Sequence, residues 1–156
     1  MRFPLVHGAN LEGRAFTLPD EFDGDLNLVL IAFQRRQQID VDTWVPAAKA
    51  EMKRYPSLRY YELPIISRHI PFARWWLDGA MRAGIPDRAA REATITLYLD
   101  KAAFRRQLEL PTEGTIYVVL VTREGQVLWR TEGAWTPEAG SSLEKILSHS
   151  SAAPAT

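Results

Sequence analysis

The chain has 156 residues, 46% of them hydrophobic and 24% charged, and its 19 basic and 19 acidic residues give a formal net charge of zero. Such a chain is typical of one globular domain, and it lacks the basic excess of a general nucleic-acid binder. It contains no cysteine, which excludes thiolate nucleophiles, disulfides and cysteine-ligated metals within it. The histidines are far apart in sequence, so we predict no metal site and no cofactor.

No apolar run is long enough for a membrane span. The start of the chain, Met1 to Pro4, does not have the pattern of a signal peptide. We therefore expect a cytoplasmic protein.

Residues 1–24 carry glycine and proline at short intervals between apolar anchors, which favours an extended lead-in with a short hairpin. The run Leu26–Phe33 follows and is almost continuously apolar. A strand with one exposed face would alternate apolar and polar residues, so this run predicts a strand covered on both faces at the centre of an α/β sheet.

The polar stretch 34–42 reads as a loop after this strand. Asp42 or Thr43 is then suited to cap a helix, with Pro46 in its first turn. Pro56 ends that helix.

Further elements follow at regular intervals. Residues 58–63 read as a strand that ends at Pro64, residues 94–99 as another strand, and Asp100 as the cap of a helix that ends near Leu108. The rest of the chain is predicted as a β-hairpin of strands 116–122 and 126–131, a final helix from Pro137, and a flexible tail over 149–156. We expect a single domain over residues 1–148.

Three stretches resemble the thioredoxin-like superfamily in its peroxiredoxin-like form. Phe16-Thr17-Leu18-Pro19 before the run Asn27–Phe33 is similar to that group's entry strand and core strand. Trp44-Val45-Pro46-Ala47-Ala48 stands where the family opens its first helix with a cysteine motif, and Ile116–Trp129 is similar to its closing hairpin. The resemblance implies a three-layer α/β sandwich, with a central mixed sheet, flanking helices and a C-terminal β-hairpin.

A narrower similarity is to thioredoxin-like assembly factors of mitochondrial ATP synthase. It rests on Gly79-Ala80-Met81, on Ile85-Pro86-Asp87, and on the apolar hairpin strands Tyr117–Val121 and Leu128–Arg130.

The chain also departs from the family pattern. Val45 and Ala48 lie near the expected positions of the redox cysteines, and Gly114-Thr115 replaces the family's cis-proline. The resemblance therefore does not carry thiol redox chemistry to this chain.

The first candidate site is the Arg-bearing loop before the first helix. Ligands of open α/β sheets bind beyond the carboxyl ends of strands, and free backbone N–H groups at a helix start suit an anion. We expect Arg35 or Arg36 to supply charge, and Asp42, Thr43 and Trp44 to form the helix start. The alternative is a solvated loop without a ligand.

The second candidate is the insert around Trp75 and Trp76. Adjacent tryptophans cannot share one helix face, so one of them is a candidate anchor for a protein partner, with Arg82 beside it. The alternative is that both pack in the core.

These sites favour three hypotheses, and no catalytic residue is assigned. The first is a non-redox binding or assembly module with a protein partner or a second copy. The second is a small-molecule or anion-binding protein, or a cysteine-independent enzyme, that uses the Arg-bearing loop. The third is a descendant of a peroxiredoxin with only a structural role.

Overall fold

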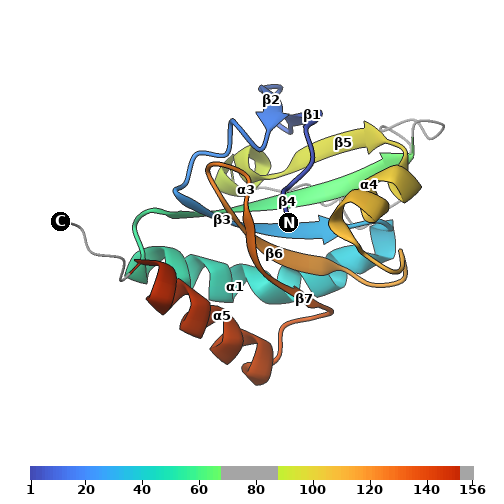
Figure 1. The fold of residues 1–156 in the computed structure, drawn as a ribbon. Coiled ribbons are helices and arrows are strands. Elements are labelled where there is room, and N and C mark those ends of the chain that lie inside the picture. Colours follow the sequence, from blue (N-terminus) through green and yellow to red (C-terminus); the bar gives the residue numbers. More distant parts are fainter. Residues whose placement is uncertain (68–87, 152–156) are drawn as a thin grey trace.

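A computed structural model describes residues 1–67 and 88–151 (Figure 1). Between β3 and β6 its strands alternate with helices, as in an α/β fold, and hairpin strands lie at both ends of the sequence. In order they are β1 (Val6–Asn10), β2 (Ala15–Leu18), β3 (Leu26–Ala32), a 3-10 helix η1 (Arg35–Gln37), α1 (Gln38–Arg54), β4 (Leu58–Ser67), α3 (Arg88–Ala93), β5 (Ile95–Leu99), α4 (Lys101–Leu108), β6 (Tyr117–Thr122), β7 (Val127–Glu132) and α5 (Pro137–Ser151).

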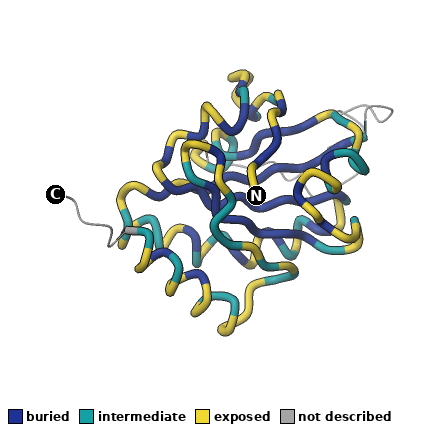
Figure 2. Tube along the Cα trace, in the orientation of Figure 1, coloured by how far each residue is buried: buried dark blue, intermediate teal, exposed yellow. Residues whose placement is uncertain are grey.

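The strands form one mixed sheet of seven, in the order β2-β1-β5-β4-β3-β6-β7. Strand β3 runs parallel to β4 and antiparallel to β6, so that Leu30 lies opposite Glu62 on one side and Val118 on the other. Every residue of β3 is buried, and the inner strands of the sheet are the most continuously buried part of the tube in Figure 2. The prediction that Leu26–Phe33 forms the central strand is confirmed.

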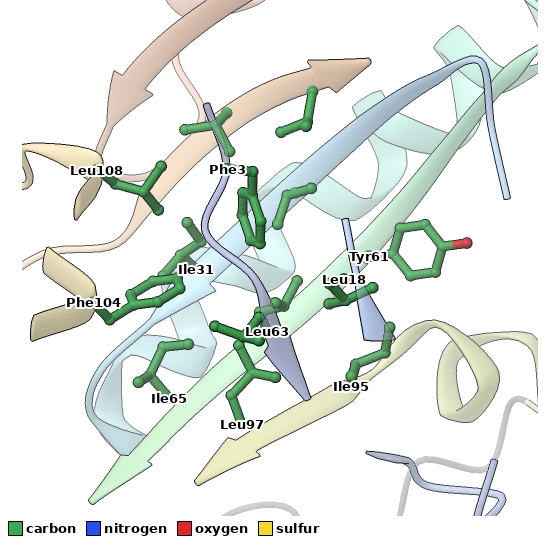
Figure 3. Packing of buried hydrophobic residues seen from close by; sticks show 14 of the residues in the cluster. Phe3, Leu18, Ile31, Tyr61, Leu63, Ile65, Ile95, Leu97, Phe104 and Leu108 are labelled. Atoms are coloured by element: carbon green, nitrogen blue, oxygen red, sulfur yellow. The ribbon is translucent and has the colours of Figure 1, made fainter. Parts of the chain in front are cut away.

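Successive side chains of β3 enter two separate apolar layers, because side chains alternate between the faces of a strand. Val29 and Ile31 pack with Phe104 and Leu108 of α4 in the first layer, part of which Figure 3 shows. Leu28 and Leu30 pack in the second layer, together with residues of α1 and α5. Helices α1 and α5 lie along the same face of the sheet (Figure 1), which gives the expected layers of helix, sheet and helix.

The predicted hairpins and the cap at Asp100 are also confirmed. Strands β1 and β2 pair as the expected short hairpin, and β6 and β7 form the closing one. The side chain of Asp100 accepts a hydrogen bond from the backbone N–H of Ala103 at 3.2 Å, as a helix N-cap does.

The predicted start of the first helix is wrong. Helix α1 begins at Gln38 and not at Asp42 or Thr43, and Pro46 lies inside the helix instead of in its first turn. The stretch that reads as a loop folds into η1 and the first turn of α1. It does so because the side chains of Gln34 and Gln37 cap the backbone at this point, which residue type alone does not indicate.

Two other boundaries differ from the sequence reading. Strand β4 continues through Pro64 to Ser67, because Pro64 stands where pairing with β3 ends and pairing with β5 begins. Helix α5 extends to Ser151, so residues 149–151 are helical instead of forming part of a tail. The insert residues Trp75, Trp76 and Arg82 lie outside the described residues.

Candidate functional site

The amino-terminal end of α1 is built around the buried side chain of Gln37, which is 1% exposed. Its Oε1 accepts hydrogen bonds from the backbone N–H groups of Phe33 at 2.8 Å and Gln34 at 3.1 Å. Its Nε2 donates to the backbone carbonyl of Glu113 at 2.8 Å. One amide therefore joins the end of β3, the start of α1 and the segment that leads into β6.

Neighbouring side chains add further hydrogen bonds at the same junction. Gln34 Nε2 donates to the Glu113 carbonyl at 2.9 Å, and Lys101 Nζ donates to the carbonyl of Phe33 at 2.6 Å. Arg36 Nε donates to Gln34 Oε1 at 2.9 Å. Arg35 and Arg36 are both exposed on η1, and within residues 1–67 and 88–151 neither forms an ion pair. The junction thus presents two guanidinium groups to solvent.

The structure separates the remaining residues of the Arg-bearing loop. Asp42 and Thr43 are exposed on the second turn of α1, while Trp44 is fully buried. Backbone N–H groups beyond the first turn of a helix bond within the helix. The expectation that Thr43 and Trp44 offer free N–H groups is therefore wrong, since α1 begins at Gln38.

A buried carboxyl group lies beneath α1. Glu62 of β4 is 6% exposed, and Gln38 Nε2 bridges Glu62 Oε1 at 3.0 Å and Asp42 Oδ1 at 2.9 Å. Burial raises the pKa of Glu62, and the charge of Asp42 raises it further, whereas the Gln38 hydrogen bond and Lys49 lower it. Glu62 is therefore a weaker acid than an exposed glutamate.

A groove of about 410 Å³ lies between α1 and α5. Its α1 wall is made of Ala47, Ala50 and Glu51, and the opposite wall includes Trp135, Gly140 and Glu144. The side chains of the α1 wall are short except for Glu51, and Trp135 is 39% exposed. An exposed tryptophan in a hollow has the features of a protein-binding anchor.

Trp135 is held in place by two residues of the predicted site. Its backbone N–H donates to Thr43 Oγ1 at 2.9 Å, and Thr43 Oγ1 in turn donates to the carbonyl of Asp40 at 2.6 Å. Trp44 Nε1 donates to the carbonyl of Gly133 at 3.0 Å, which fixes the start of the same turn. Thr43 and Trp44 therefore hold the backbone of the turn that carries Trp135.

The glycine at position 140 lets the indole of Trp135 lie against α5. A Cβ atom there would be 2.9 Å from Trp135 Nε1 and 3.0 Å from Cζ2, closer than carbon atoms normally approach. The indole is thus placed before any partner arrives.

Several of these residues have no clear sequence signal. Gln34, Gln37 and Glu113 act through amide and carbonyl geometry that spacing does not reveal. Glu62 does leave a signal, because it shares a strand face with Leu58 and Tyr60, where an apolar residue is expected. Trp135 also leaves one, as an aromatic residue in the short turn between Gly133 and Pro137.

The chemistry available to the described residues is limited. Among residues 1–67 and 88–151, no three His, Asp or Glu side chains gather closely enough to bind a metal ion. No helix in the same ranges has the length and apolarity needed to cross a membrane. Gln37 stands just before α1, and its neutral amide cannot act as a nucleophile as a thiolate does.

Comparison with known proteins identifies the fold. No protein-family profile and no curated protein matches the sequence. Among solved structures, BsSco, a member of the Sco family of cytochrome c oxidase assembly proteins, superposes with a TM-score of 0.69 at 11% identity, covering 98% of this chain and 95% of BsSco.

Two oxidoreductase structures are also similar. The thioredoxin domain of a thiol-disulfide oxidoreductase from Bacteroides vulgatus gives a TM-score of 0.60 at 16% identity, covering 94% of this chain and 95% of that domain. A thiol-disulfide oxidoreductase from Bacteroides fragilis gives 0.59 at 15% identity, with coverage of 94% and 99%. The chain therefore has a thioredoxin-like fold, and it has this fold without a single cysteine.

Proposed function

We propose that the chain is a non-redox binding module, and that it holds a protein partner in the groove between α1 and α5. The observation that carries this proposal is the exposed side chain of Trp135, whose backbone is tied to Thr43 and whose indole lies against Gly140. A preorganised aromatic side chain loses little conformational freedom on binding. Such a residue contributes strongly to affinity when a partner covers it.

The fold comparison is compatible with a role in assembly. BsSco belongs to a family of assembly proteins by its own description, so a thioredoxin-like fold can serve that purpose. The absence of cysteine removes the chemistry of the oxidoreductase neighbours, and binding is the activity that the remaining surface supports.

The experiment is a selection of phage-displayed random dodecapeptides on the immobilised wild-type chain. Peptides that bind in the groove are expected to bind the Trp135→Ala variant at least about tenfold more weakly, as for an interface hot spot. The matched control is the double variant Arg35→Ala/Arg36→Ala, which leaves the groove intact and should bind as the wild type does. If Trp135→Ala binds every selected peptide unchanged, the groove is not the binding surface.

A second candidate function rests on Arg35 and Arg36, whose guanidinium groups are exposed on the junction around Gln37. We propose an anion as the ligand in that case. A thermal-shift screen of phosphates, carboxylates and nucleotides should then raise the melting temperature of the wild type but not of the double arginine variant. The shift should shrink with added salt, because exposed charges are screened over about 10 Å at 0.1 M. An equal shift in both proteins would exclude this site.

A further inference from the structure

The groove between α1 and α5 carries acidic side chains. Its lining includes the carboxyl groups of Glu51 and Glu144. The neighbouring cation Arg54 contacts both, with Nη1 at 2.8 Å from Glu144 Oε1 and 3.5 Å from Glu51 Oε1. One guanidinium group against two carboxylates leaves a net negative charge when all three are ionised.

One carboxylate oxygen of this cluster has no hydrogen-bond donor. Glu51 Oε2 is buried and unpartnered in the described part of the chain, and the Glu51 side chain is only 13% exposed. A buried acceptor without a donor is costly, and a donor from a ligand would satisfy it. Burial also raises the pKa of Glu51, an effect that Arg54 partly opposes and Glu144 reinforces.

The aromatic side of the groove also suits a ligand that carries a hydrogen-bond donor and a positive charge. The indole of Trp135 lines the hollow with Glu51 and Glu144, and 39% of its surface remains exposed. A cation placed over an indole is attracted by the electron-rich face of the ring. A planar guanidinium group can stack on an indole and donate several hydrogen bonds to carboxylates at the same time.

We propose that the groove accepts a basic side chain of the partner, arginine in preference to lysine, between Trp135 and the carboxylates of Glu51 and Glu144. This inference rests on the proposed function, and it states which chemistry the partner presents to the groove. The alkyl stem of the arginine would pack on Ala47 and Ala50, since such stems readily cover apolar surface.

The test uses N-acetyl-arginine methylamide as the probe, with N-acetyl-citrulline methylamide as its neutral isostere. Both are titrated into the labelled full chain and followed by NMR at the amides of Ala47, Ala50 and Gly140 and at the indole N–H of Trp135. We expect the arginine probe to shift these signals in a saturable way. The citrulline probe should bind about tenfold more weakly or not at all, because hydrogen bonds from charged donors are the stronger ones.

Two variants test whether the carboxylate of Glu51 binds the arginine probe. Glu51→Gln should weaken binding of the arginine probe by about tenfold. Glu138→Gln changes an exposed glutamate in the first turn of α5 that does not line the groove, so it should bind as the wild type does. If both variants bind the arginine probe more weakly, the attraction depends only on the overall charge of the surface, and the inference is overturned.

The remaining outcomes separate this inference from the proposed function. If both probes shift the groove signals equally, or if Glu51→Gln has no effect, the groove binds without selecting a cation. If neither probe shifts them, the inference fails as well. In each of these cases the proposed function stands or falls separately, on the sensitivity of the selected peptides to Trp135→Ala.

Discussion

The side-chain amide of Gln37 donates to the backbone carbonyl of Glu113 across 2.8 Å and thereby joins the start of α1 to the segment before β6. The same carbonyl accepts a second amide hydrogen bond, from Gln34. The family resemblance places the redox cysteines near Val45 and Ala48, which the structure puts inside α1 and not at its start. The Gln37 amide is a neutral group with hydrogen bonds on both its oxygen and its nitrogen, and its contribution is to the fold.

Replacing Gln37 by alanine should therefore destabilise the protein by about 1–3 kcal/mol, because it leaves buried backbone donors without an acceptor. The free energy of unfolding is measured by denaturant titration. Gln107→Ala is the matched control, since Gln107 is exposed on α4 and should change stability by less than about 0.5 kcal/mol. Equal effects of the two substitutions would mean that the Gln37 junction contributes nothing specific.

Leu30 tests the central position of β3. It is fully buried in the layer that α1 and α5 cover, so Leu30→Ala should cost about 2–5 kcal/mol. Leu5→Ala makes the same chemical change at a residue that is 67% exposed, and it should cost far less. A loss well under about 1 kcal/mol for Leu30→Ala would be incompatible with a central strand.

Gly8 tests the contact between β1 and β5. A Cβ atom at Gly8 would lie 2.4 Å from the backbone carbonyl oxygen of Thr96, which cannot move aside as a side chain can. Gly8→Ala should therefore destabilise the protein by about 1–3 kcal/mol through overpacking. At Gly114 an added Cβ would meet only the hydroxyl of Thr112, at 3.2 Å, so Gly114→Ala should be tolerated. Similar melting temperatures for both variants would contradict this close approach.

We expect the buried carboxyl group of Glu62 to make the stability of the protein depend on pH. Its pKa is higher in the folded protein than the ordinary value of 4.5, so the folded state binds the Glu62 proton more tightly than the unfolded state does. The contribution of this group to stability is greatest at low pH and declines as pH rises from about 4.5 through the folded pKa.

Glu62→Gln keeps the size of the side chain but removes the charge. It should raise the free energy of unfolding at pH 7 by about 1 kcal/mol and reduce this decline, as measured by denaturant titration between pH 4 and pH 8. The exposed Glu124→Gln serves as the control and should leave the profile unchanged. A Glu62→Gln variant that is less stable than the wild type at pH 7 would show that the charged form of Glu62 is the stabilising one.

Redox assays provide a further prediction. A chain without cysteine has no thiolate to attack a disulfide or a peroxide. We expect no turnover in insulin-reduction or peroxide-consumption assays of the purified protein. Activity that scales with protein concentration and persists through further purification would refute this expectation.

The layers of the fold can be predicted from the sequence, whereas the start of α1 cannot. The run Leu26–Phe33 identifies the central strand because burial on both faces favours apolar residues at almost every position, and Asn27 is the one polar residue in the run. The start of α1 was misplaced because Asp42 and Thr43 are strong capping residues, whereas the real junction depends on the long side chain of Gln37. Long amides have no local preference of this kind, and their partners, such as Glu113, are distant in sequence.

The candidate surfaces were predicted less well for a related reason. That Thr43 and Trp44 bind a ligand stays a prediction, and the structure adds that both hydrogen-bond to the turn that carries Trp135. That relationship depends on α5 and α1 lying together, which is a tertiary arrangement. The exposure of Arg35 and Arg36 follows from local polarity, and whether they bind an anion stays a prediction.

The pairing of β3 has a consequence for the order in which the protein can be synthesised and folded. Its first partner, β4, follows soon after it along the chain, but its second partner, β6, comes only after β5 and α4. A nascent chain that has not yet reached Thr122 must therefore keep one edge of an almost entirely apolar strand unpaired, and such edges promote aggregation. Truncations that end before β6 should be insoluble, however intact their first half is, and a pause in translation between β4 and β6 would leave the chain dependent on chaperones.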